Sequence, residues 1–100
     1  MKLEEFIQSV EKSSNPPPDF SPCLQALWWT KKGDWHKAHD ISQEIEEAEG
    51  SWIHAHLHRV EGDLGNAAYW YSRAGKAVKT KEDLNQEWEL IVDSLLGSEF

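Results

Sequence analysis

The stretch Lys32-Gly33-Asp34-Trp35-His36-Lys37-Ala38-His39-Asp40-Ile41 is followed, 29 residues later, by Glu61-Gly62-Asp63-Leu64-Gly65-Asn66-Ala67-Ala68-Tyr69-Trp70, with matches at Gly, Asp and Ala. In each copy the glycine can end one helix, and the aspartate can cap the next. The repeated unit is therefore helix, Gly-Asp turn, helix. It predicts an all-α fold built from helical hairpins.

Apolar spacing on the N-terminal side of the repeat predicts two more helices. The first covers residues 2–12, where one face carries Leu3, Phe6, Ile7 and Val10. The segment 13–21 should be a stiff arm, because it holds three successive prolines. Ser21 and Pro22 predict the start of a second helix, over 22–32, that Gly33 ends.

The rest of the chain predicts four further helices. In the third, capped by Asp34, we expect one face of Ala38, Ile41, Ile45 and Ala48 and an end at Gly50. A fourth should follow Ser51 over 52–61, with Trp52, Ile53, Leu57 and Val60 on one side. Asp63 or Asn66 can cap a fifth, which ends near Gly75.

A Thr80 and Asp83 capping box predicts a sixth helix over 80–96, whose apolar face carries Leu84, Trp88, Ile91, Val92 and Leu95. No segment alternates as a strand would. We therefore expect a single all-α domain over residues 1–100, with about six short helices and a hairpin core over 22–75.

The Gly-Asp corners resemble those of tetratricopeptide repeats, in which an alanine follows the corner and packs between two helices. Ala67, Tyr71 and Ala74 match this pattern, and Ala38, Ser42 and Ile45 match it in part. The resemblance implies tetratricopeptide-like hairpins over about 22–75, with the first and last helices as terminal caps. Residues 52–75 are also similar to a group of short, uncharacterised bacterial proteins, and that likeness implies no activity.

Charge and composition exclude some classes of binding partner. Eighteen acidic against ten basic side chains give a net charge of −8, which repels nucleic acid and anionic membranes. No apolar run is long enough to span a membrane, and the acidic N-terminus is unlike a signal peptide, so we expect a cytoplasmic protein. Cys23 is the only cysteine and should be a small core residue. Nucleotide-binding glycine motifs are missing, and we expect no cofactor.

Histidines are the strongest candidates for chemistry. His54, His58 and Glu61 share one side of a helix and could hold a divalent metal, with a further ligand from another helix. His56 should point to the apolar side, bonded to a carbonyl or a carboxylate. We expect His36 and His39 to be solvated or to pack within a hairpin.

The sequence leaves three functions open. The first is a non-catalytic protein-interaction module, self-associating or binding another protein through Tyr69, Trp70, Trp52 and Trp35, with Tyr69 the exposed member. In one version the first helix docks Leu3, Phe6, Ile7 and Val10 onto a neighbouring subunit. The second is a metal-binding protein or metal-dependent hydrolase that uses His54, His58 and Glu61. The third is a small-ligand pocket lined by tryptophans and His56.

Overall fold

Six helices and no strand are found in residues 1–97, the part of the chain that the computed structural model describes. They are α1 (Leu3–Lys12), α2 (Pro22–Lys32), α3 (Trp35–Gln43), α4 (Ala48–Glu61), α5 (Leu64–Ala74) and α6 (Leu84–Gly97). The predicted all-α class is confirmed. None of these helices has the length and apolar character needed to cross a bilayer.

The two Gly-Asp corners adopt the same backbone conformation. Gly33 and Gly62 have φ values of 98° and 90°, in the left-handed region that glycine tolerates best. The next residues, Asp34 and Asp63, have φ/ψ of −97°/81° and −93°/80°. Each aspartate accepts a hydrogen bond from the backbone N–H three residues ahead, at 3.1 and 3.2 Å. The sequence repeat is therefore also a structural repeat.

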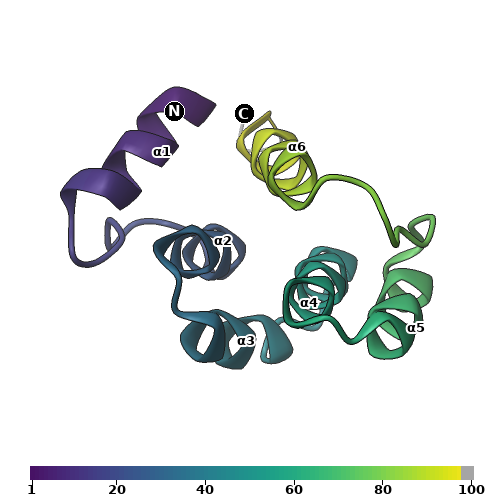
Figure 1. Ribbon diagram of the computed structural model, residues 1–100. Coiled ribbons are helices and arrows are strands. Elements are labelled where there is room, and N and C mark those ends of the chain that lie inside the picture. The colour runs from purple at the N-terminus through teal and green to yellow at the C-terminus, as the bar shows by residue number, and fades with distance from the viewer. Residues whose placement is uncertain (98–100) are drawn as a thin grey trace.

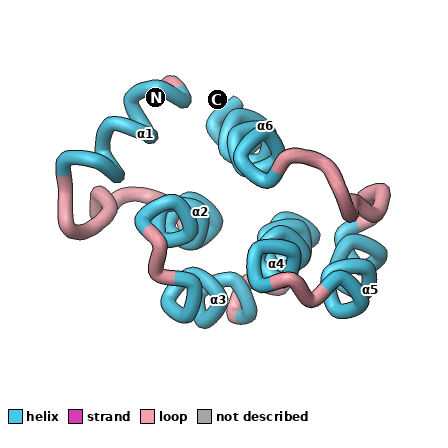
Figure 2. Tube along the Cα trace, in the orientation of Figure 1, coloured by secondary structure: helices cyan, strands magenta, loops and turns pink. Residues whose placement is uncertain are grey.

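The hairpins α2–α3 and α4–α5 place α2 and α4 at the centre of the molecule (Figure 1). Helices α3 and α5 lie on one side of these two, and α1 and α6 lie on the other, where they contact each other. The first and last helices therefore lie on the same side of the two central helices. The loop after α5 carries the chain across to α6, as the tube in Figure 2 shows.

Helix α1 packs onto its own chain. Phe6 is fully buried and stacks on Phe20 with ring centroids 5.3 Å apart, and it also contacts Trp88. Val10 is buried, whereas Leu3 and Ile7 are half-buried against the same core. Lys32 donates to the carbonyls of Val10 and Ser13 and so fixes the end of α1. If α1 docked onto a neighbouring subunit instead, it would have to replace these contacts by the same contacts in the second copy.

The predicted boundary between the third and fourth helices is wrong. Helix α3 ends at Gln43, and α4 already begins at Ala48, with Glu47 and not Ser51 as its N-cap. Gly50 lies inside α4. Its lack of a side chain lets Ile45 pack closely, since a Cβ there would stand 2.6 Å from the Ile45 Cβ and carbonyl oxygen. Glycine at this position serves packing and does not end a helix.

The start of the last helix also differs from the prediction. Asp83 caps α6 by accepting from the N–H of Gln86 at 2.8 Å, and Thr80 lies in the preceding loop. Of the predicted apolar face, Trp88, Ile91 and Val92 are buried, whereas Leu84 is exposed. Val60, predicted to lie on the apolar side of α4, is likewise exposed, because it falls in the last turn of that helix.

Candidate functional site

Helix α4 is buried from Gly50 to Arg59, so its polar side chains lie against other parts of the protein. Its histidines divide between two sides. His54 and His58 face α3 and α5, and His56 faces α6, as the residues that each contacts show. Two polar clusters result, one on each side of α4.

The first cluster joins His54 and His58 to His39 of α3. His39 contacts both rings nearly edge-on, with centroids 4.4 Å from His54 and 5.4 Å from His58. His54 and His58 stack at 4.8 Å. We call these three residues the histidine cluster. Because His39 comes from the first hairpin and the others from the second, the cluster spans the contact between the two hairpins.

Two tryptophans close the ends of the histidine cluster. Trp70 of α5 stacks on His54 with a centroid distance of 3.9 Å and an interplanar angle of 9°. Trp35 stacks on His39 at 4.7 Å, and its indole N–H donates to the Leu57 carbonyl at 2.7 Å. His54 and His58 are only 4% and 6% exposed, and His39 is half-buried. Solvent therefore reaches the cluster at His39.

The three histidines form a group that could hold a metal ion. One ligand atom from each of His39, His54 and His58 lies within 4.8 Å of the other two. A tetrahedral zinc ion with Zn–N distances of about 2.0–2.1 Å needs its ligand atoms roughly 3.4 Å apart. Closing a site around zinc would therefore draw these ligand atoms closer together.

Glu61, predicted as a ligand, instead contacts the back of His58. Its Oε2 lies 2.5 Å from His58 Nδ1. A carboxylate only accepts, so Nδ1 carries the proton and the lone pair of the neutral ring sits on Nε2. Glu61 also groups with His58 and Asp63 as a set of potential ligand atoms within 4.8 Å of one another, but both acids are exposed.

The environment favours the neutral form of two members of the cluster, His54 and His39. Burial, followed by the nearby His39 and His58 rings, lowers the pKa of His54 from 6.5 to about 4. The pKa of His39 is also lowered, first by burial and then by His58. Within residues 1–97 the side chains of His39 and His54 make no hydrogen bond to the protein. A neutral imidazole with a free lone pair is the form that binds a metal.

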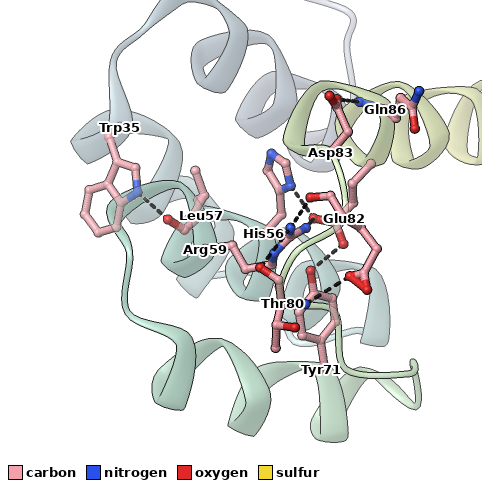
Figure 3. Close-up of polar contacts among 10 residues, drawn as sticks. Trp35, His56, Leu57, Arg59, Tyr71, Thr80, Glu82, Asp83 and Gln86 are labelled. Atoms are coloured by element: carbon pink, nitrogen blue, oxygen red, sulfur yellow. Dashed lines mark hydrogen bonds and ion pairs between the residues drawn. The ribbon is translucent and has the colours of Figure 1, made fainter.

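The second cluster lies on the other side of α4 and is centred on Glu87 of α6; we call it the Glu87 network. Glu87 Oε1 accepts from His56 Nδ1 at 2.6 Å and from Arg59 Nη1 at 2.8 Å, and Oε2 accepts from the Tyr71 hydroxyl. Figure 3 shows the side chains of His56, Arg59 and Tyr71 close together on this side of α4. His56 was predicted to bond a carbonyl or a carboxylate, and its partner is the Glu87 carboxylate.

Arg59 ties the loop before α6 into the Glu87 network. Its Nη2 donates to the carbonyls of Thr80 and Glu82, and only Nε is left without a partner among the described residues. Burial would raise the pKa of Glu87, but hydrogen bonds from His56 and Tyr71 and the charges of His56 and Arg59 outweigh it and lower that pKa. These contacts hold α6 onto α4 and α5.

The structure separates the predicted aromatic site residues. Tyr69 is exposed, as expected, at 55%. Trp35 and Trp70 are half-buried against the histidine cluster, and Trp52 is buried with the Lys76 ammonium 4.1 Å from its ring centre. They do not form one surface. His36 is exposed, and Cys23 is half-buried against the core.

Sequence reasoning placed His54 and His58 on one face but missed His39 as the third member. It also missed the partners of His56, although Glu87 stands within the apolar stripe of α6, three residues after Leu84 and four before Ile91. An acid at such a position is a signal for a buried partner. Comparisons with protein families, curated proteins and solved structures found no match to this chain.

Proposed function

We propose that the protein binds a divalent transition metal through His39, His54 and His58. The observation that carries this proposal is the approach of three imidazoles from two hairpins, with ligand atoms within 4.8 Å of one another. Imidazole nitrogens suit zinc, copper and nickel, whereas calcium and magnesium prefer oxygen. Three ligands leave a fourth position for water or for a group from another molecule.

Two further features support metal binding over simple packing. The lowered pKa values of His39 and His54 keep these rings deprotonated at neutral pH, so a metal does not have to displace their protons. The Glu61 contact directs the His58 lone pair to Nε2. A carboxylate that hydrogen-bonds the far nitrogen of a ligand histidine is a recurrent feature of metal sites.

Metal binding would link two helices and stabilise the fold. A metal held by His39 and by the α4 histidines would join α3 to α4, two helices that touch through the short 44–47 segment and side-chain packing. A ligand that binds only the folded chain stabilises it, by about 2.7 kcal/mol at a free concentration of 100 times Kd. We expect zinc to raise the melting temperature.

Calorimetric titration with Zn²⁺ tests the proposal, with Co²⁺ absorbance as a probe of tetrahedral coordination. Loss of binding in His39→Ala, His54→Ala and His58→Ala is expected. His36→Ala is the matched control, because His36 is the exposed neighbour outside the cluster. Quenching of Trp35 and Trp70 fluorescence by Cu²⁺ gives an independent readout, since both rings stack on ligand rings. Full affinity in His39→Ala would contradict the site.

A second candidate is a protein-interaction module of tetratricopeptide-like hairpins. The two identical Gly-Asp corners support that architecture, and such arrays present extended binding surfaces. The specific observation is Tyr69, which is 55% exposed on α5 with the Arg73 guanidinium 5.9 Å from its ring centre. Sedimentation of the wild type and Tyr69→Ser tests self-association. A monomer at all concentrations would remove a second copy as the partner.

A further inference from the structure

A groove lies on the side of the molecule where α2 begins and the chain passes from α3 to α4. It has a volume of about 640 Å³. Its lining comes from the first turn of α2, from α3 and from the 44–47 segment: Ser21, Pro22, Cys23, Lys37, Asp40, Ile41, Glu44, Ile45 and Glu47. None of these residues belongs to the histidine cluster or to the Glu87 network.

The groove is apolar inside and acidic at its edge. Cys23, Ile41 and Ile45 are half-buried and form the inner wall. The exposed charged residues are three acids, Asp40, Glu44 and Glu47, against one base, Lys37. The Lys37 ammonium lies 4.2 Å from the centre of the Trp29 ring, a cation–π contact within its own protein. The rim therefore presents net negative charge.

Two nearby acids, Glu47 of the rim and Glu49 outside the lining, act on Cys23. Burial first, and then the charges of Glu49 and Glu47, raises the pKa of the Cys23 thiol to about 11. Cys23 is consequently a neutral thiol at physiological pH and contributes an apolar surface. A ligand with positive charge at its edges and an apolar group between them is complementary to this wall and rim.

We propose that this groove docks a basic, amphipathic peptide segment of another protein, which inserts an apolar side chain between Cys23, Ile41 and Ile45 and places lysines or arginines beside Asp40, Glu44 and Glu47. Charge complementarity selects this occupant over a second copy at the groove, because the acidic rim would face a chain whose own net charge is −8. A peptide also suits this open groove better than a small molecule does, because small-molecule sites usually enclose most of their ligand. This inference is independent of the proposed metal site.

Cys23 supplies a direct readout, because it is the only cysteine and it lines the groove. The probe is a synthetic helical peptide of lysine and leucine with one apolar face, added to the full chain in chelator-treated buffer. Alkylation of Cys23 by a maleimide, followed by intact mass, should slow as the peptide binds. Two matched peptides complete the set, one with glutamate for lysine and one with serine for leucine. Neither should protect the thiol.

Charge-neutralising variants locate the contact. Glu44→Gln/Glu47→Gln should weaken peptide affinity roughly 10-fold and make it less sensitive to salt. The control Glu4→Gln/Glu11→Gln makes the same charge change on exposed positions of α1 and should leave affinity within about 2-fold. His54→Ala should bind the peptide as the wild type does. Folding of each variant is checked by circular dichroism.

Several outcomes would overturn the inference. Equal weakening in both charge variants would mean that binding follows overall charge and not the groove. Protection of Cys23 by the serine peptide would show that no apolar side chain is needed for binding. Protection by spermine as strong as that by the lysine and leucine peptide would assign the groove to small polyamines. Protection that rises with protein concentration alone would identify a second copy as the occupant.

Discussion

The histidine cluster and the Glu87 network lie on opposite sides of the same helix and differ in how their polar groups are satisfied. His56 is matched with a carboxylate, and that carboxylate also accepts from Arg59 and Tyr71. Among the described residues, His54, two residues earlier, contacts the rings of His39, His58 and Trp70, and the charge of Arg73 also acts on it. One arrangement is closed by the protein itself, and the other leaves lone pairs for a ligand. Residue type alone therefore does not identify the functional histidine, whereas its partners do.

The largest expected effect is on the closed side. Glu87→Gln keeps the shape of the side chain but leaves the buried Arg59 charge uncompensated, so it should cost about 3–5 kcal/mol of unfolding free energy. Urea denaturation at neutral pH measures this. Asp93→Asn, on an exposed position of the same helix, is the control. A cost below about 1 kcal/mol would show that the Glu87 network is not what holds α6.

Lowering the pH should separate the two clusters. The pKa of His54 is about 4 in the folded chain and 6.5 ordinarily, so between these values the unfolded chain binds more protons. This contribution is complete above pH 6.5 and is lost as the pH falls toward 4, by up to about 3 kcal/mol. The contribution of Glu87, whose pKa is lowered from 4.5, is lost only as the pH falls below that value.

Chemical denaturation at a series of pH values measures these two losses. His54→Phe preserves a flat ring against Trp70 but cannot be protonated. It should therefore flatten the stability profile between pH 6.5 and 4 and leave the steeper loss below pH 4.5. His36→Phe, at an exposed position, should change the profile much less, because His36 is only the last of the causes that act on His39. An unchanged slope in His54→Phe would mean that the histidine cluster does not carry the acid sensitivity.

Much of the fold could be predicted from the sequence because its signals are local. The Gly-Asp corners at 33–34 and 62–63 need a left-handed glycine and a capping aspartate, and both requirements are visible in adjacent residues. The α3–α4 boundary could not be predicted in this way. Gly50 has the appearance of a helix end, but its role depends on the approach of Ile45, which only the folded chain brings about.

In the candidate site, too, the local features could be predicted from the sequence and the contacts between helices could not. The four-residue spacing of His54 and His58 fixes their common face through helix geometry. The third member, His39, arrives from another hairpin, and its distance depends on how α3 packs on α4. The sequence could suggest a ligand from a second helix but could not choose it. Glu61 was assigned as a ligand from spacing alone, whereas the structure places it behind His58, at Nδ1.

The role of Glu61 is testable by affinity. Glu61→Ala removes the acceptor that fixes the His58 tautomer, and loss of such an outer partner typically weakens metal binding by 10- to 100-fold. Calorimetry with Zn²⁺ measures the change, and Glu61→Gln should fall between Ala and wild type. Metal-free stability should change by less than about 1 kcal/mol, because the carboxylate is 40% exposed. Glu46→Ala, exposed on the preceding segment, is the control.

The smallest expected effect tests whether the histidine cluster depends on its tryptophan wall. Trp35→Phe removes the 2.7 Å hydrogen bond to the Leu57 carbonyl but keeps an aromatic ring against His39, so it should cost about 1 kcal/mol of stability. Trp88→Phe, which loses the equivalent bond to the Leu27 carbonyl beside the Glu87 network, is the matched variant. If the two sides of α4 are independent, zinc affinity should fall only in Trp35→Phe. An equal fall in both variants would show that the histidine cluster responds to the whole core.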